Sequence, residues 1–275
     1  MQSLSEIKAI LSERGLRPRH RFGQNFLIEP MHLRRLVEAA SIAAGDAILE
    51  VGPGTGTLTE ELLASGARIV ASEIDRDLAS LLRERFGDAI QLVEGDVLSA
   101  KRSIAAEVTG SMGGREFKLV SNLPYQIASP LLAILASDPR CLGCFVTVQR
   151  EVADRLGAGP GKSDYGPLSV MVQSRFEVSR IADLPPGCFW PPPKVTSAMV
   201  AMTPRVRPAV PLERLDAFGR FVQSIFGKRR KQLGSIVGRA TPLPDGIDPS
   251  ARPESLAIDD WVRLWNVLPG DSPRG

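Results

Sequence analysis

The chain has 275 residues, of which 43% are hydrophobic, so it can bury a complete α/β core and still supply a smaller second domain. No apolar run has the length of a signal peptide or a membrane-spanning helix, which argues against secretion and membrane insertion and predicts a soluble, cytoplasmic protein. Three cysteines cannot form a complete disulfide framework, and the net charge of +3 hides basic clusters that are typical of polyanion-binding proteins.

The first predicted elements are two helices around a basic, irregular stretch. The first helix covers residues 4–12, and the irregular stretch runs through Gly23. The second helix covers residues 30–43, because Pro30 suits a first helical turn and apolar residues recur on one face from Leu33 onward.

From residue 47 onward, short apolar runs alternate with helical patterns, which is the signature of βαβ units. Four strand-helix steps in order predict an α/β fold with a doubly wound, mostly parallel, Rossmann-like sheet. The predicted strands are 47–51, 67–72, 90–93, 117–121, 144–148, 176–182 and 195–202, and the predicted helices between the first four are 57–64, 76–86 and 101–108.

After residue 204 the pattern changes to helices alone, and several prolines punctuate the junction. We therefore predict a Rossmann-like first domain over 1–204 and a small all-helical domain over 205–275. The apolar residues of the second domain recur at helical spacing over 212–226, 233–237 and 258–267.

The first βα turn contains Gly52, Gly54 and Gly56. Glycines in such a turn let the backbone approach a ligand closely. Thr57 stands where the G-x-G-x-x-G dinucleotide fingerprint has its last glycine, so no pyrophosphate loop is completed. The turn therefore predicts a nucleotide-like ligand of another kind.

Carboxylates follow at the ends of the next two predicted strands. Glu73 lies about twenty residues after Gly52, where such folds place a carboxylate that accepts hydrogen bonds from both ribose hydroxyls; Asp75 is the neighbouring alternative. Asp96 ends the next strand, within reach of an adenine amino group. Turn glycines and helix-capping carboxylates explain any one of these placements, but their succession on three strand ends favours a nucleoside site.

The fourth strand ends at Asn122, Leu123, Pro124 and Tyr125, and this segment indicates the reaction. An exocyclic amine is a poor nucleophile because its lone pair is delocalised into the ring. The side-chain carbonyl of Asn122 and the backbone carbonyl of Leu123, which Pro124 biases toward an extended conformation, can accept the amine hydrogens. Tyr125 offers a ring on which an extruded base can stack, so catalysis rests on positioning rather than on a strong base.

A second aromatic candidate lies in a proline-rich loop before the last strand. Phe189 or Trp190 can close the other side of the base. The alternative is a hydrophobic plug at the edge of the sheet. The C-x-x-C pair of Cys141 and Cys144 has too few further ligands for a tetrahedral zinc site, so we predict no metal and interpret both as buried strand residues.

Basic residues gather at two places. Residues 14–21 contain four arginines, and residues 205–240 contain nine lysines or arginines against two acidic residues. Each cation that contacts a phosphate releases a counterion, although a solvated helix face is the alternative. We predict contacts with a polyanion such as RNA from Arg19, Arg21, Lys228, Arg229, Arg230 and Lys231.

Together these residues resemble those of the ribosomal RNA adenine dimethyltransferases, which modify two adjacent adenines near the 3′ end of small-subunit RNA. The resemblance covers nearly the whole chain, and its combination of motifs is highly specific. The matching segments are Arg21-Phe-Gly-Gln-Asn-Phe-Leu27, the glycine turn, Glu73, Gly95-Asp96, Asn122-Leu-Pro-Tyr125, Gln149-Arg-Glu-Val152, Phe189, Pro191-Pro-Pro-Lys-Val195 and Arg229-Arg-Lys231.

The resemblance implies a Rossmann-like catalytic domain, a helical RNA-contacting domain and S-adenosyl-L-methionine as the cofactor. The implied partner is small-subunit ribosomal RNA in an immature 30S particle, and we expect a monomer. The target base is implied to lie among Asn122, Tyr125 and Phe189. Two positions depart from the family pattern: Thr196 replaces a usual aspartate, and Trp190 replaces a smaller residue. The cofactor site is implied to include Asn25, Leu27, Gly52, Gly54, Gly56, Glu73, Asp96 and Asn122.

Three alternatives remain. A related enzyme methylates one adenine of large-subunit RNA and confers antibiotic resistance, but Leu123 in place of isoleucine and the string Gly23-Gln-Asn25 disfavour it. A non-catalytic RNA-binding or transcription factor of the same fold would not need intact cofactor residues. A DNA adenine methyltransferase shares the asparagine logic, but its basic helices would have to read a duplex groove.

Overall fold

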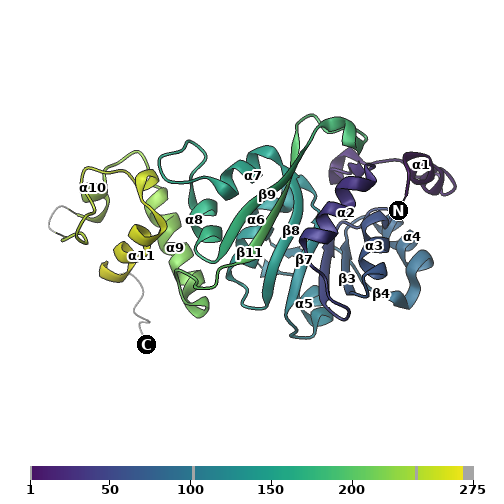
Figure 1. Cartoon of the computed structure of the whole chain (residues 1–275), viewed down its shortest axis with the longest axis horizontal. Coiled ribbons are helices and arrows are strands. Elements are labelled where there is room, and N and C mark those ends of the chain that lie inside the picture. The colour runs from purple at the N-terminus through teal and green to yellow at the C-terminus, as the bar shows by residue number, and fades with distance from the viewer. Residues whose placement is uncertain (1, 101–102, 239–240, 269–275) are drawn as a thin grey trace.

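The computed structural model describes residues 2–100, 103–238 and 241–268, and a seven-stranded sheet forms its centre (Figure 1). The strands are β2 (Ala47–Val51), β3 (Arg68–Glu73), β4 (Ile90–Glu94), β7 (Phe117–Asn122), β8 (Cys141–Gln149), β9 (Phe176–Leu184) and β11 (Ser197–Pro204). Their order is β4-β3-β2-β7-β8-β11-β9. The first five pair in parallel, and β11 pairs antiparallel with β8 and β9. The predicted Rossmann-like sheet is confirmed.

Helices cover both faces of this sheet (Figure 1). On one face α2 (Pro30–Ala39) and α3 (Thr57–Ala64) pack against a core that includes Ile48 and Val120. On the other face α5 (Ala106–Met112), α6 (Tyr125–Ser137) and α7 (Arg150–Gly157) pack against a core that includes Leu49 and Leu119. Neighbouring strand residues point to opposite faces, so strands buried on both faces need the continuous apolar runs from which they were predicted.

Two predicted helices differ from the structure. The helix predicted over 30–43 ends at Ala39, and Ser41 has a φ of 44°, which no helix accommodates. The prediction over 101–108 is wrong. Its start lies outside the described residues; β5 (Leu98–Ser99) pairs instead with β6 (Ser103–Ile104), and α5 begins only at Ala106. The N–H of Ala105 donates to the carbonyl of Val97 at 2.8 Å, so the described residues on either side of 101–102 pair as strands instead of beginning a helix.

Some elements escaped prediction. Helices α6, α7 and α8 (Pro167–Gln173) were not predicted, and one reason is that Pro130 lies inside α6. Strand β8 begins at Cys141 rather than at Cys144, and both cysteine side chains are buried with their Sγ atoms 3.7 Å apart. The interpretation of this pair as buried strand residues is confirmed.

The N-terminal region is tied to the proline-rich loop. Helix α1 (Leu4–Ser12) forms as predicted and is followed by the short 3₁₀ helix η1 (His20–Phe22). Strand β1 (Phe26–Leu27) then pairs antiparallel with β10 (Phe189–Trp190), with Phe26 opposite Trp190 and Leu27 opposite Phe189. Two short segments that are far apart in the sequence thus form one small sheet.

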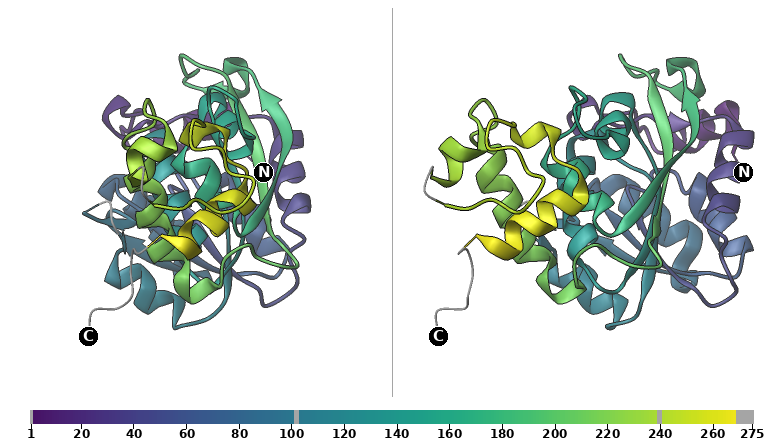
Figure 2. Two further views of the ribbon diagram at one scale, coloured as in Figure 1. Left: turned by 90° about the vertical axis from the view of Figure 1, so that its left-hand side faces the viewer. Right: turned by 60° about the vertical axis from the view of Figure 1, so that its left-hand side comes forward.

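The C-terminal helices are α9 (Leu215–Phe226), α10 (Leu233–Val237) and α11 (Ile258–Val267), at the end of the molecule opposite α1 (Figure 2). Their core includes Phe218 and Trp261, and also Tyr165 and Met171, which precede the junction at residue 204. A Cβ atom added to Gly219 would lie 2.6 Å from Sδ of Met171, so α9 lies directly on α8. None of the described helices is long and apolar enough to cross a membrane.

Candidate active site

A cavity of about 320 Å³ opens at the carboxyl ends of β2, β3, β4 and β7. Parallel strands end at the same edge of a sheet, so residues that follow different strands meet there. Of the predicted site residues, Gly56, Phe189 and most of the predicted RNA contacts do not line this cavity. Those that do are Arg21, Asn25, Leu27, Gly52, Gly54, Glu73, Asp96, Asn122, Leu123, Pro124 and Tyr125.

The glycine turn after β2 is closely packed. Gly52, Gly54 and Gly56 all have positive φ, between 65° and 86°. A Cβ on Gly54 would lie 2.9 Å from the Phe26 ring, and a Cβ on Gly56 would lie 2.4 Å from the ring of Phe86 in α4 (Arg76–Phe86). Gly56 therefore allows helix packing, whereas Gly52 and Gly54 present bare backbone to the cavity.

Glu73 ends β3 with a buried carboxylate that is 4% exposed. It accepts hydrogen bonds from the N–H groups of Gly54 at 3.3 Å and Asp75 at 2.9 Å. Burial raises its pKa to about 7, although both hydrogen bonds oppose the shift. The side chain is therefore held in place by backbone groups while it lines the cavity.

Glu50 is a cavity residue that sequence analysis missed. It lies in β2, is 1% exposed, and accepts a hydrogen bond from the Thr59 hydroxyl at 2.7 Å. Burial, together with the neighbouring charge of Glu73, raises its pKa to about 8. Glu50 could have been identified from the sequence, because it is a lone carboxylate inside an apolar strand. Burying a carboxylate without a cationic partner costs free energy, so such a residue usually has a function.

The part of the cavity next to the ends of β3 and β4 is lined by one further acid and by apolar side chains. Asp96 follows β4 and accepts a hydrogen bond from the N–H of Leu98 at 2.9 Å. Ile74, which is 46% exposed, and Val97 flank the acidic positions in the cavity. Neither was singled out from the sequence, because an apolar residue next to a strand end resembles any other core residue.

Asn122 ends β7, and its Nδ2 donates to the backbone carbonyl of Asn25 at 3.0 Å. Only the amide NH₂ can donate to a carbonyl, so this bond fixes the orientation of the side chain. Within the described residues the Oδ1 of Asn122 has no protein donor, and Asn122 lines the cavity. A free acceptor is thus presented at the point where the sequence predicts the amine.

The neighbours of Asn122 are equally constrained. Leu123 donates its N–H to the carbonyl of Thr147 in β8 at 3.1 Å. Pro124 caps α6, and the hydroxyl of Tyr125 is hydrogen-bonded to the Ser197 hydroxyl in β11. Burial raises the pKa of Tyr125, so the phenol stays neutral. The Tyr125 ring therefore has a fixed position in the cavity wall.

Neither Phe189 nor Trp190 lines the cavity, although the sequence predicts that one of them closes the other side of the base. Phe189 is 2% exposed and belongs to the same apolar core as Leu27, its partner across the small sheet. Trp190 stacks on Phe26 with ring centroids 6.2 Å apart, and Lys8 Nζ lies 5.3 Å from the Trp190 ring. The loop thus supports the N-terminal side of the cavity in this structure.

The predicted RNA contacts fall into three environments. Arg21 lines the cavity, and its guanidinium lies over the Phe22 ring at 4.6 Å. Arg19 is ion-paired with Asp75 and Asp77. The third group follows α9 in the C-terminal helices, is exposed and consists of Lys228, Arg229, Arg230 and Lys231.

Comparisons with known proteins agree with one another. A family model described as ribosomal RNA adenine dimethylase matches residues 15–269. Ribosomal RNA small subunit methyltransferase A of Moorella thermoacetica is 38% identical over 94% of this chain and 96% of that protein. The Pseudomonas aeruginosa protein of the same name is 39% identical over 92% of this chain and 95% of its own.

Two solved structures share the fold over most of this chain. A dimethyladenosine transferase from Plasmodium falciparum superposes with a TM-score of 0.70 at 26% identity, covering 87% of this chain and 95% of that one. The 23S rRNA methyltransferase ErmE superposes with a TM-score of 0.68 at 25% identity, covering 89% and 99%.

Proposed function

The chain belongs to the ribosomal RNA adenine dimethylase family, and from this premise we propose how its cavity performs the reaction. The protein is an S-adenosylmethionine-dependent rRNA adenine dimethyltransferase, and it converts two adjacent adenosines in the 3′-terminal hairpin of small-subunit ribosomal RNA to N6,N6-dimethyladenosine. The observation that carries the proposed mechanism is the Asn122 amide: the residue lines the cavity, its Nδ2 is held by the Asn25 carbonyl, and its oxygen has no protein donor among the described residues.

The cavity residues fit S-adenosylmethionine. A bare glycine backbone, two buried carboxylates and apolar side chains suit an adenosine joined to a cationic amino-acid tail. We assign Glu73 to the ribose hydroxyls and Asp96 to the adenine amino group. When bound, S-adenosylmethionine supplies an electrophilic methyl group on a sulfonium. The remaining cofactor contacts are assigned to Asn25, Leu27, Gly52, Gly54 and Asn122, with Gly56 acting through helix packing.

The chain contributes positioning rather than a strong base. Asn122 Oδ1 and the Leu123 carbonyl accept hydrogen bonds from the N–H groups of the target amine. These bonds direct the nitrogen lone pair away from the ring. Tyr125, whose hydroxyl is held by Ser197, presents its ring to the extruded base. Pro124 fixes the turn between them. Phe189 packs against Leu27, which lines the cavity, so we propose that it supports the cavity through Leu27. The sequence predicted instead that Phe189 contacts the base.

The affinity for S-adenosylmethionine is expected to rise as the pH increases from about 6 to about 8. Burial raises the pKa of Glu73 to about 7 and of Glu50 to about 8, so both carboxyls are largely protonated at the lower pH. A bound cation favours the carboxylates, so binding near pH 7 releases protons. Calorimetry in two buffers of different ionisation enthalpy measures this release. Equal heats in both buffers, with a flat pH profile, would contradict it, and Glu50→Gln should remove the upper part of the rise.

We propose that the exposed C-terminal cations bind RNA phosphates. Replacing residues 228–231 by alanine is expected to weaken RNA binding and to flatten the dependence of log affinity on log salt by about 0.7 for each phosphate that these side chains neutralise. A variant that exchanges lysine and arginine within the run keeps the charge and serves as the control. An unchanged salt slope in the alanine variant would make this run a solvated surface.

The proposal also covers the substrate particle, the oligomeric state, the location in the cell and the domain division. We propose an immature 30S particle as the substrate, a monomeric enzyme and a cytoplasmic location. We also propose the division into 1–204 and 205–275, with the two parts joined through the shared core around Tyr165 and Met171. The last described residue of the second part is 268.

The direct test is nucleoside mass spectrometry of small ribosomal subunits that lack these methyl groups, after incubation with the protein and labelled S-adenosylmethionine. We expect labelled dimethyladenosine at two adjacent positions near the 3′ end. Likeness to a 23S rRNA methyltransferase makes large-subunit RNA the second candidate substrate, and label found only there would favour it. No label in either RNA would favour a binding factor that keeps the fold.

A further inference from the structure

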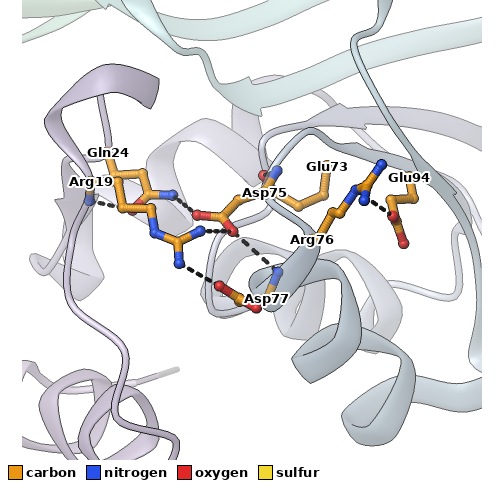
Figure 3. Close-up of polar contacts among 7 residues, drawn as sticks. All are labelled: Arg19, Gln24, Glu73, Asp75, Arg76, Asp77 and Glu94. Atoms are coloured by element: carbon orange, nitrogen blue, oxygen red, sulfur yellow. Dashed lines mark hydrogen bonds and ion pairs between the residues drawn. The ribbon is translucent and has the colours of Figure 1, made fainter.

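The basic stretch before β1 is fastened to the turn that follows Glu73 (Figure 3). Arg19 Nη1 lies 2.7 Å from Asp75 Oδ1, and its other terminal nitrogen pairs with Asp77. Gln24 Nε2 donates to Asp75 Oδ2 at 2.9 Å, while Gln24 Oε1 accepts the N–H of Arg19 at 2.7 Å. We call residues 19–27 the N-terminal strap and Arg19, Gln24 and Asp75 the clasp.

The Asp75 end of the clasp is rigid. The Asp75 side chain is 3% exposed. Its Oδ1 also accepts a hydrogen bond from the N–H of Asp77, so Asp75 is the N-cap of α4. The backbone N–H of Asp75 donates to Glu73 Oε1 at 2.9 Å. Asp75 thus connects the strap directly to the carboxylate that we assign to the cofactor ribose.

The other end of the strap reaches the reaction centre. Asn25 and Leu27 line the cavity, and the Asn25 carbonyl accepts the hydrogen bond that orients Asn122. Between these points the Phe26 ring lies so close to Gly54 that a Cβ there would be 2.9 Å from it. The strap therefore lines the cavity between the turn after Glu73 and Asn122.

We propose that Arg19 is a positioning residue, which acts through the clasp to hold the strap across the cofactor cavity and so keeps Glu73 and Asn122 in register. This inference rests on the proposed function, because it gives the strap a task only if the cavity holds the cofactor. The sequence predicted that Arg19 contacts RNA. We propose instead that it belongs to the clasp, because two carboxylates already neutralise its guanidinium.

The clasp differs from an ordinary surface ion pair. An exposed pair contributes little because water solvates both partners once it breaks. Here the Arg19 side chain is 35% exposed but that of Asp75 is only 3% exposed, so removing Arg19 leaves a buried carboxylate oxygen with one donor fewer. The expected consequence is release of the strap rather than a small change in stability.

Trypsin digestion reports the strap without any need for methyl transfer. The Arg21–Phe22 bond lies inside the strap and remains a cleavage site in Arg19→Ala. We expect Arg19→Ala and Asp75→Asn to accelerate cleavage at this bond and to raise the Kd for S-adenosylmethionine about tenfold, measured by calorimetry. Asp75→Asn keeps an oxygen for the α4 cap. The kcat at saturating substrates should fall severalfold, and the KM for RNA should not change.

Two variants provide the controls. Arg17→Ala removes the same charge from an exposed position with no carboxylate partner within the described chain, and trypsin does not cut its bond to Pro18. It should alter neither cleavage nor cofactor affinity. Arg19→Lys reaches one carboxylate but not both, so it should restore part of the affinity. The double variant of Arg19 and Asp75 should be no worse than the worse single variant.

The outcomes separate the two proposals. If Arg19→Ala leaves cleavage and cofactor affinity unchanged and weakens RNA binding instead, Arg19 is a phosphate-binding residue and the clasp is overturned. If cleavage accelerates and S-adenosylmethionine binding weakens while the wild-type protein methylates no ribosomal RNA, the clasp holds and the proposed reaction fails.

Discussion

Asn122→Ala is expected to reduce kcat for methyl transfer by at least about a hundredfold while S-adenosylmethionine still binds. The reason is that alanine removes the oriented acceptor for the amine hydrogens but leaves Glu73 and the glycine turn in place. The Nδ2 of Asn122 donates to the Asn25 carbonyl at 3.0 Å, and this hydrogen bond fixes the direction of the side-chain oxygen before the substrate binds. Alanine removes that oxygen. Single-turnover methylation and calorimetry on the same variant measure the two effects separately.

Asn122→Asp is the informative companion. Aspartate keeps an acceptor at the same distance from the backbone, but it has no hydrogen to donate to the Asn25 carbonyl. We expect residual activity above that of alanine together with faster trypsin cleavage in the strap, because two oxygens now face each other. If both variants lose cofactor affinity to the same extent as they lose activity, Asn122 is a binding residue and the proposed division of roles is wrong.

Glu73→Ala is expected to produce the opposite pattern, with an affinity for S-adenosylmethionine at least about a hundredfold lower and a much smaller effect on kcat at saturation. A carboxylate that accepts from both ribose hydroxyls makes two charge-assisted hydrogen bonds, each of about 1.5–3 kcal/mol when desolvated. Calorimetric titration measures the affinity, and saturating methylation assays measure kcat.

The control for this prediction concerns folding. Glu73 accepts two backbone N–H groups, so alanine leaves the donors of Gly54 and Asp75 unpaired. Glu73→Gln keeps an acceptor in place without the charge, and thermal unfolding of both variants distinguishes a damaged loop from the removal of a ligand-binding group. An S-adenosylmethionine affinity close to that of the wild type in a folded Glu73→Ala would remove Glu73 from the cofactor site and leave Glu50 as the acidic candidate.

Much of the fold could be predicted because its signals are local. The strands at 47–51, 90–93 and 117–121 are apolar runs of strand length, and helix 76–86 has an apolar face and a capping aspartate. The order of strands and helices then restricts the topology, since parallel strands need crossover helices. The same order brings Gly52, Glu73, Asp96 and Asn122 to one edge, so most of the cavity lining followed from strand ends alone.

Helices were missed where the pattern is not amphipathic. Helix α6 is apolar on most sides and contains Pro130, so periodicity could not separate it from a buried strand or loop. The reverse error occurred at 101–108, where a helical pattern was overridden by the pairing of β5 with β6. In both places a neighbouring segment decides the structure, and the local sequence does not contain that information.

The sequence by itself determined the order of the elements, the residues at the strand ends and the chemistry that those residues can perform. Only the tertiary structure decided which distant groups meet: Arg19 with Asp75, Asn25 with Asn122, and Phe189 with Leu27 instead of with the open cavity. The physical reason is that strand and helix preferences act within a few residues, whereas a hydrogen bond across the cavity depends on how every intervening element packs.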